Sequence, residues 1–429
     1  MELSWGILGP DMLSTTRRTR TLGLGSVVRS FNDLAVPGMG GVWFGRQIVL
    51  ALLGIDLATE ARARGHKVSN IQVANAVEAL GCWSALQNSE AVDPRVRGRR
   101  KLQGRADVSF RSLIRPGAYV TQPMRMATGQ CLLALDLVRS SKERFNSYQC
   151  TDEALRLLDV AFEGFSPNRR PVRSNLLRWI DGDATCVSTT ESRNALASNG
   201  ALNAAAREII KERVVASDSS GRRQNLLLWM NTLSHPDGGP STAIRWDKKP
   251  EWIDEGHWRD LKVGSEFFVA RTNAISVLDT IEETIGGLSD RVLDIAYHVP
   301  RIAETAIETL QRSADAFLSS GFDPSPEGQA SVFCAQCSGS VKKAAVVASL
   351  VERDDRVLRL RGTQIVPGPA FVGRAAARTV DDTDETTSEG PIETLGASIR
   401  WPDGISFRLP NLHLLNADLK GNLNQVLSS

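Results

Sequence analysis

Residues 94–105 are the part of the chain whose residue types best suit a binding role. Six of these twelve residues are cationic, namely Arg95, Arg97, Arg99, Arg100, Lys101 and Arg105. Arginine carries a planar fork of hydrogen-bond donors that matches a phosphate group, so this basic run is suited to contact nucleic acid. Gly98 and Gly104 are expected to keep its backbone loose.

Two other interpretations of the basic run stay open. Runs of like charge are usually solvated segments held extended by their own repulsion, and an acidic protein partner would also suit them. The chain contains 41 arginines and 10 lysines, a skew that a GC-rich genome also produces and that favours a bacterial source. Because the formal net charge is only +2, any nucleic-acid surface must be local.

Cys334 and Cys337 form the second pair with a chemically meaningful spacing. Two thiolates three residues apart can bind one zinc ion from a tight turn, but a closed structural site needs four ligands. The sequence contains no second CxxC and no HxxxH. We therefore expect two small, buried, reduced residues and no cofactor. Zinc, with further ligands from distant residues or from a partner chain, is one alternative, and redox chemistry of the two thiols is the other.

The remaining motifs are weaker. Residues 40–47 have glycines five apart, but Arg46 and Gln47 replace the lysine and the serine or threonine of a phosphate-binding loop. Residues 40–47 are therefore not expected to bind ATP. A glycine loop before a helix can still hold an anion through its free amides. Asp181 and Asp183 could bind a hydrated metal ion, but without a third carboxylate nearby a polar turn is the simpler interpretation. We assign no catalytic residue.

Helices are predicted on both sides of the basic run. An apolar helix is expected over 42–64, and the next one begins after Ser69, which forms a capping box with Gln72. This pair and the basic run would suit a helix-turn-helix with a wing-like loop, whereas a helical hairpin packed in a core is more common. Further helices are predicted over 122–139, 151–165, 201–215 and 222–233.

The strongest helical period covers residues 264–285 and ends at Gly286 and Gly287. A second helix is expected from Ser289 to about Ser319, kinked or divided by Pro300, so that the two form a long antiparallel hairpin. Short strands are predicted beyond a linker at 323–328, over 357–360, 398–401 and 405–409. Between them, the acidic segment 381–389 is expected to be a mobile loop.

These patterns predict a mainly α fold, a multi-helix bundle with a long helical hairpin and a small mixed α/β C-terminal region. We expect an N-terminal Gly/Arg-rich segment, helical pair and basic loop over 1–110, a helical domain over 111–321, and a small α+β region over 322–429. The chain has 429 residues, 42% apolar and 23% charged, which is ordinary for a globular protein. Six cysteines and no evident targeting or membrane-spanning segment favour a reduced, cytoplasmic setting.

The function expected from the sequence is that of a non-catalytic, mostly helical subunit of a bacterial multiprotein complex. It would contact DNA or RNA through the arginine-rich loop, and an accessory system such as antiviral phage defence is one fitting context. Other protein subunits are expected partners, and neither a membrane nor a small-molecule substrate is indicated. The alternatives are a metal-dependent hydrolase or nuclease with an unrecognised site, and a structural adaptor that binds no nucleic acid.

Overall fold

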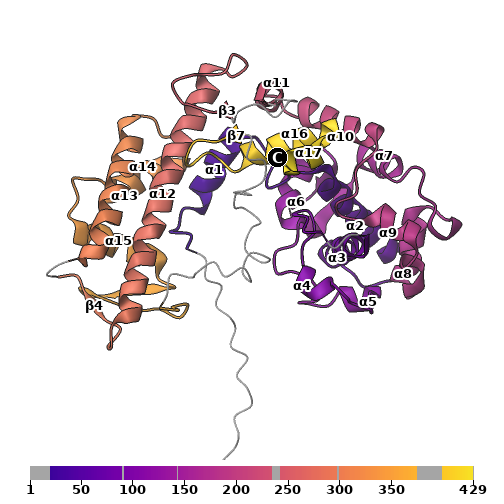
Figure 1. The fold of residues 1–429 in the computed structure, drawn as a ribbon, viewed down its shortest axis with the longest axis horizontal. Helices are drawn as coiled ribbons and strands as arrows, with labels where there is room; N and C mark the ends of the chain where they lie inside the picture. The colour runs from indigo at the N-terminus through magenta and orange to yellow at the C-terminus, as the bar shows by residue number, and fades with distance from the viewer. Residues whose placement is uncertain are drawn as a thin grey trace, which may run out of the picture. The chain divides into compact units, whose positions relative to one another are not determined.

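The computed structural model describes residues 20–88, 91–142, 144–233, 242–296, 299–373 and 399–428. The predicted acidic loop at 381–389 lies outside these ranges. The chain divides into two compact units, each built from two separated stretches of the sequence (Figure 1). Unit 1 comprises Met1–Val28 and Glu266–Ala377, and unit 2 comprises Arg29–Ser265 and Arg378–Ser429. The division into 1–110, 111–321 and 322–429 stays a prediction.

Unit 2 is built around two buried helices, α2 (Gly45–Ala63) and α3 (Asn70–Asn88). Fifteen of the 19 residues of α2 and 13 of the 19 of α3 are buried. A methyl group added to Gly54 of α2 would lie 2.4 Å from the Cα atom of Ala74 in α3, so the helices cross where glycine leaves room. The predicted capping box is present, because the Ser69 amide donates to Gln72 Oε1 and the Gln72 amide donates to Ser69 Oγ, at 2.9 and 3.3 Å.

Within the described residues, the rest of unit 2 is made up of shorter helices, two strand pairs and short 3₁₀ turns. The helices are α1 (Gly25–Ala35, shared with unit 1), α4 (Arg99–Leu102), α5 (Phe110–Leu113), α6 (Arg125–Ala134), α7 (Asp152–Ala161), α8 (Val172–Ile180), α9 (Thr190–Leu196), α10 (Ala204–Ala216), α11 (Arg222–Leu233), α16 (Arg408–Lys420) and α17 (Leu423–Ser428). Strands β1 (Val138–Ser140) and β2 (Tyr148–Cys150) pair antiparallel, and β3 (Thr242–Ala243) and β7 (Ile399–Arg400) pair parallel. Short 3₁₀ turns lie at η1 (Phe145–Ser147), η2 (Pro167–Arg169) and η3 (Ala184–Val187).

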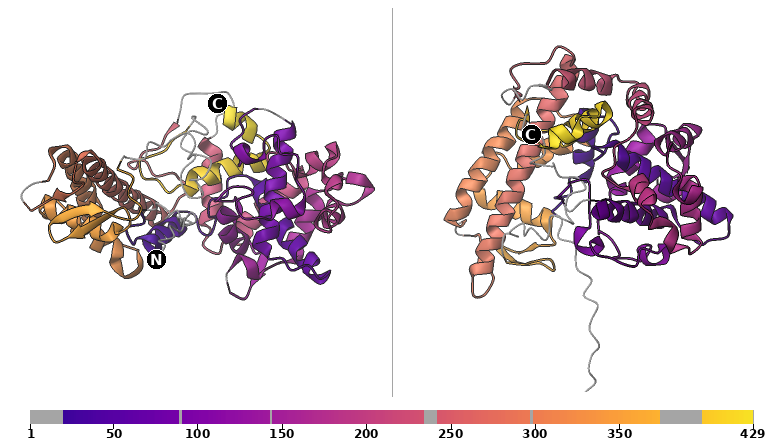
Figure 2. Two further views of the ribbon diagram at one scale, coloured as in Figure 1. Left: turned by 90° about the horizontal axis from the view of Figure 1, so that it is seen from below. Right: turned by 45° about the vertical axis from the view of Figure 1, so that its right-hand side comes forward.

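Unit 1 is organised by α12 (Glu255–Gly287, which begins in unit 2) and α13 (Arg301–Ser319), which lie side by side in Figures 1 and 2. Phe267 meets Phe317 edge to face at 6.1 Å, and Asn273 donates to Ser313 Oγ at 3.1 Å, so the helices run antiparallel. The residues of the predicted apolar stripe are fully buried, namely Phe267, Ala270, Ala274, Val277, Leu278, Ile281 and Ile285. The predicted helical hairpin is confirmed.

Within its described residues, the rest of unit 1 consists of two helices, one 3₁₀ turn and a small antiparallel sheet of strand order β4-β6-β5. These elements are β4 (Leu293–Asp294), η4 (Pro326–Gly328), α14 (Gln329–Gln336), α15 (Lys343–Asp354), β5 (Leu358–Arg361) and β6 (Gln364–Pro367). β5 confirms the strand predicted at 357–360. The helix predicted from Ser289 begins only at Arg301, because Pro300 lies at its N-cap and the segment before it includes β4.

The strand predicted at 405–409 is wrong, because α16 begins at Arg408. Ten of the 13 residues of α16 are buried, so the helix lacks the one-sided apolar stripe that would have distinguished it from a strand. In total the described residues form 17 α-helices and seven short strands, which confirms the mainly α fold class. In the same residues, no helix combines the length and the apolar character needed to cross a membrane.

Candidate nucleic-acid interface

The basic run is an ordered part of unit 2. Its centre forms the single-turn helix α4, which packs against α3. Gly98 precedes α4 with φ +71°, and a Cβ atom at this position would lie 2.6 Å from the ring of Tyr119. The sequence suggested that Gly98 loosens the backbone, but in the structure it does not. It lets the chain turn in the left-handed region and lie directly against a buried ring.

Arg95 is directed into the protein. Its side chain is bonded to Asp93 through two N–H groups, at 3.0 and 2.8 Å, and it also donates to Asn424 Oδ1 at 2.8 Å. Burial alone would raise the pKa of Asp93, but the hydrogen bonds and the charge of Arg95 hold that pKa below its usual value. Arg95 therefore connects the start of the run to α17, and this role is structural.

Arg97 supports a buried carboxylate. Glu78 of α3 accepts hydrogen bonds from the amides of Met124 and Arg125, at 2.6 and 3.1 Å, at the start of α6. Burial raises the pKa of Glu78, and the nearby charge of Arg97 opposes that rise. Arg97 also donates to the carbonyl oxygen of Gln122 at 3.0 Å. This second arginine of the run thus stabilises the junction between α3 and α6.

Arg105 fixes the connection between α4 and α5. Its guanidinium donates to the carbonyl oxygens of Asp107 and Ala118, at 2.8 and 2.9 Å, and to Ser112 Oγ at 2.6 Å. One side chain thereby ties together the loop after α4, the helix α5 and the segment beyond it. Arg99 similarly donates to the carbonyl oxygen of Ala91, at 2.7 Å.

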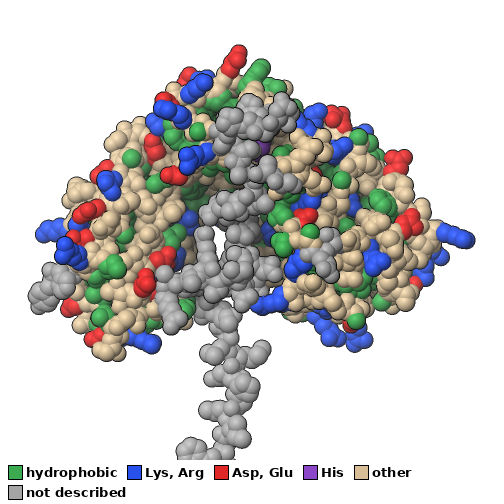
Figure 3. Space-filling model, viewed as in Figure 1, with side chains coloured by type: hydrophobic (Ala, Val, Ile, Leu, Met, Phe, Trp, Pro, Cys, Tyr) green, Lys and Arg blue, Asp and Glu red, His purple; other side chains and the backbone are tan. Residues whose placement is uncertain are grey.

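Four cationic residues on or just after α4 and α5 lie wholly or partly at the surface. Arg100, Arg111 and Arg115 are exposed and Lys101 is half-buried, and we name these four residues the α4–α5 surface. Figure 3 shows Lys and Arg side chains gathered at the edge of unit 2 where α4 and α5 lie. Within the described ranges, Lys101, Arg111 and Arg115 form no ion pair with another residue.

The α4–α5 surface differs from the site predicted from the sequence. Of the six predicted residues, Arg100 and Lys101 belong to this exposed surface. Arg95, Arg97, Arg99 and Arg105 donate hydrogen bonds to neighbouring parts of the chain. Arg111 and Arg115 lie outside the run and were missed. A signal for them exists, because residues 94–134 contain nine Lys and Arg residues and a single carboxylate, Asp107.

The helix-turn-helix interpretation is not supported by the burial of α3. A recognition helix needs an exposed face that enters the DNA groove. Most of α3 is covered, and its exposed residues are confined to Gln72 near its start and to its last turn. The helices α2 and α3 form the packed hairpin that was the alternative.

Cys334 and Cys337 lie at the end of α14 in unit 1, and both side chains are fully buried. Burial raises the pKa of both thiols, that of Cys337 to about 12, so the thiolate form that binds zinc is disfavoured. No group of three or more His, Cys, Asp or Glu side chains that could hold a metal ion exists within the part of the chain that the structure describes.

The glycine loop before α2 is occupied by the protein's own side chains. The amide of Gly45 donates to Asp418 Oδ2 at 2.7 Å, and Gln47 Oε1 accepts from the amides of Trp43 and Phe44 at 2.9 and 3.3 Å. An external anion would have to displace Asp418. This loop is therefore a buried helix start with an internal carboxylate.

The two aspartates of the possible metal pair face different partners. Asp181 contacts Arg64 and His66, at 3.2 and 2.8 Å, whereas Asp183 pairs with Arg178 at 2.5 Å and accepts from the Thr185 amide at 3.2 Å. They form the polar turn expected as the simpler interpretation.

No family model matches the chain, and neither the curated proteins nor the solved structures contain a significant match to it.

Proposed function

We propose that the protein is a nucleic-acid-contacting subunit of a larger assembly and that it binds the phosphate backbone through the α4–α5 surface. The observation that carries the proposal is that some cations of residues 94–134 stabilise the local fold whereas others lie at the surface. Arg95, Arg97 and Arg105 hold the local fold, and Arg100, Lys101, Arg111 and Arg115 are presented together on ordered elements.

The chemistry of this surface favours phosphate over bases. Arginine and lysine at a surface neutralise phosphates and release bound counterions, which gives affinity with little dependence on sequence. The helices α4 and α5 have four residues each, too few to place a recognition helix along a groove. The proposed contact therefore positions nucleic acid and does not read its sequence.

The test replaces Arg100, Lys101, Arg111 and Arg115 by glutamine in the full chain. The matched control replaces Arg301, Arg312, Arg356 and Arg361, four exposed arginines of unit 1, by glutamine. Both variants lower the formal net charge by four, from +2 to −2. Binding to dye-labelled single-stranded and double-stranded DNA and RNA of unrelated sequences is measured by fluorescence anisotropy at several salt concentrations.

We expect the α4–α5 variant to lose affinity for all sequences about equally, while the control retains most of the parent's affinity. The slope of log affinity against log salt should flatten by about 0.7–0.9 for each lost phosphate contact. Equal losses in both variants would mean that net charge, and not this surface, drives binding. A parent protein that binds none of the probes would overturn the proposal, and an adaptor that binds only proteins would become the better interpretation.

A further inference from the structure

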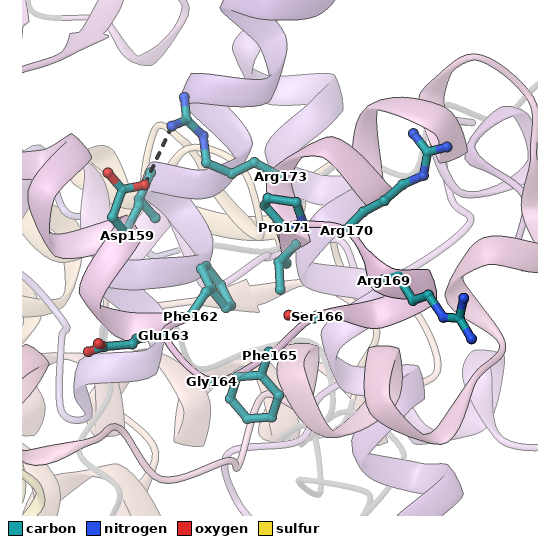
Figure 4. A pocket seen from close by; sticks show the side chains of 12 residues that line it. Asp159, Phe162, Glu163, Gly164, Phe165, Ser166, Arg169, Arg170, Pro171 and Arg173 are labelled. Carbon is teal, nitrogen blue, oxygen red and sulfur yellow. Dashed lines mark ion pairs between the residues drawn. The ribbon is translucent and has the colours of Figure 1, made fainter.

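A cavity of about 260 Å³ lies in unit 2 between the end of α7 and the start of α8 (Figure 4). Buried apolar side chains contribute to its lining, among them Leu158, Phe162 and Val172, and the half-buried ring of Phe165 lies beside them. Ligand sites in proteins are mostly apolar concavities with a few well-placed polar groups. The size of this one suits a ligand smaller than a typical drug molecule.

The loop that borders the cavity has an unusual backbone. Asn168 and Arg169 both lie in the left-handed region of backbone conformation, with φ +53° and +58°, which residues other than glycine rarely adopt. The Asn168 amide group holds this turn by donating to Asn175 Oδ1 and to the carbonyl oxygen of Cys186, at 3.0 and 2.8 Å. Such conformations persist where surrounding contacts enforce them, and they gather at ligand-binding sites. The turn places Arg169 and Arg170 at the rim.

The charges around the cavity are separated. Figure 4 shows the carboxylates of Asp159 and Glu163 on one side and the side chains of Arg169 and Arg170 on the other, extending outward from the rim. Neither of these two arginines forms an ion pair or a side-chain hydrogen bond with another residue in the described ranges.

Arg173, the third arginine of the lining, is already engaged. It donates to both carboxylate oxygens of the buried Asp56, at 2.6 and 2.7 Å, and lies 3.7 Å from Asp159. Its charge is therefore matched within the protein. Arg169 and Arg170 are the cations of the cavity that can meet an external anion.

We propose that this cavity binds a small organic anion with an aromatic body. The anionic group would meet Arg169 and Arg170, because a guanidinium forms strong charge-assisted hydrogen bonds with phosphate and carboxylate. The aromatic body would pack against Phe162 and Phe165. At the far end, Asp159 and Glu163 would accept hydrogen bonds from an amino or hydroxyl group. A nucleoside monophosphate and an amino-substituted aromatic carboxylate both carry this chemistry.

Isothermal titration calorimetry on the full chain tests the proposal with adenosine monophosphate and 4-aminobenzoate as probes. Adenosine and inorganic phosphate serve as the separated halves of the first probe. The test variant replaces Arg169 and Arg170 by glutamine, and the control variant replaces Arg139 and Arg156, which are exposed and outside the cavity. Thermal melting of both variants confirms that the exposed substitutions leave the fold intact.

We expect one of the two anions to bind with 1:1 stoichiometry and a Kd at or below about 1 mM. The Arg169/Arg170 variant should weaken it about tenfold or more, and the control should change it less than about twofold. The tighter probe identifies the source of the anion, and adenosine and phosphate alone should bind more weakly than their combination.

Absence of binding by both probes overturns the proposal, as does equal binding by the two variants. The proposal does not depend on the α4–α5 surface. The glutamine variant of that surface should bind the small anion as the parent does, so the two proposals can fail separately.

Discussion

Residues 94–105 and residues 168–173 of unit 2 are both rich in arginine, but their side chains have different surroundings. In the first segment, Arg95, Arg97 and Arg105 donate to a carboxylate, an amide oxygen, a hydroxyl group and several backbone carbonyls. In the second, only Arg173 has such partners among the described residues, and Arg169 and Arg170 extend from the rim of a cavity.

This difference teaches that a dense cluster of cations in a sequence does not measure the charge available to a ligand. A guanidinium has five N–H donors, so an arginine near a loop can replace missing backbone hydrogen bonds and stabilise a segment without secondary structure. The long basic run has used much of its donor capacity in this way. The side chains of Arg169 and Arg170 donate no such hydrogen bonds to the described residues, although this short pair is less conspicuous in the sequence.

The largest expected effect concerns the inner face of the basic run. Replacing Gly98 by alanine should reduce the free energy of unfolding by about 2–5 kcal/mol, from left-handed strain of about 1–2 and overpacking of about 1–3. The overpacking arises because the new Cβ would lie 2.6 Å from Tyr119. Urea denaturation measures the loss.

Gly104 provides the matched control for this measurement. It has nearly the same φ, +69°, but nothing lies within 4 Å of an added Cβ. Its replacement by alanine should therefore cost only the strain, about 1–2 kcal/mol. Equal losses at Gly98 and Gly104 would show that the run does not pack against Tyr119.

The next effect separates the inner and outer arginines directly. Replacing Arg105 by alanine leaves carbonyl oxygens without a donor, and the free energy of unfolding should fall by about 1.5–3 kcal/mol. Replacing the exposed Arg111 by alanine should change it by less than about 0.5 kcal/mol. Both are measured by urea denaturation at the same ionic strength. If both substitutions have the same effect, the distinction between structural and available arginines is lost.

The third effect concerns a buried histidine with a ring nitrogen that lacks a hydrogen-bond partner, in contrast to the inner arginines. His413 of α16 is 6% exposed, and its Nδ1 atom has no hydrogen-bond partner in the described structure. Burial, with a further contribution from Lys420, lowers the pKa of His413 to about 4. Because this pKa lies below the unfolded value near 6.5, the unfolded chain binds more protons between these two pH values.

Stability from neutral His413 is therefore fully present above about pH 6.5 and is lost as the pH falls toward 4. The free energy of unfolding should drop by about 2 kcal/mol between pH 7 and pH 5 through this residue alone. The substitution His413→Gln should remove that part of the pH dependence. If the variant and the parent lose stability in parallel over this range, His413 is not buried in its neutral form.

The sequence was most informative where a motif involves only a few neighbouring residues or where apolar residues recur on one face of a helix. The capping box at Ser69 and Gln72 located the start of α3, and the stripe from Phe267 to Ile285 identified the inner face of α12. It was least informative for α16, where the alternation of Ile405, Phe407 and Leu409 resembled a strand. A helix buried on most sides has no exposed face, so its period is hidden.

The candidate sites depend on partners that sequence order does not place. The acceptors of Arg97 and Arg105 include the carbonyl oxygens of Gln122 and Ala118, residues that approach the run only through folding. The scarcity of carboxylates between residues 94 and 134, where Asp107 is the single one, was a readable sign of the α4–α5 surface. At the cavity, the turn-forming Pro167-Asn168 followed by two arginines was the available sign, but the mixed lining of apolar and charged side chains could be recognised only in three dimensions.

The hydrogen bond from the Gly45 amide to Asp418 has a consequence for how the protein is made. The two residues are 373 positions apart, and at about 5–20 residues per second a ribosome needs roughly 20–75 s to pass from one to the other. During that time residues 266–377, which belong to unit 1, emerge between the two parts of unit 2.

Throughout this interval the largely apolar α2 lacks both the carboxylate at its start and the cover of α16. Exposed apolar surface in a growing chain promotes aggregation. Unit 2 therefore completes its core only after α16 has left the ribosome tunnel.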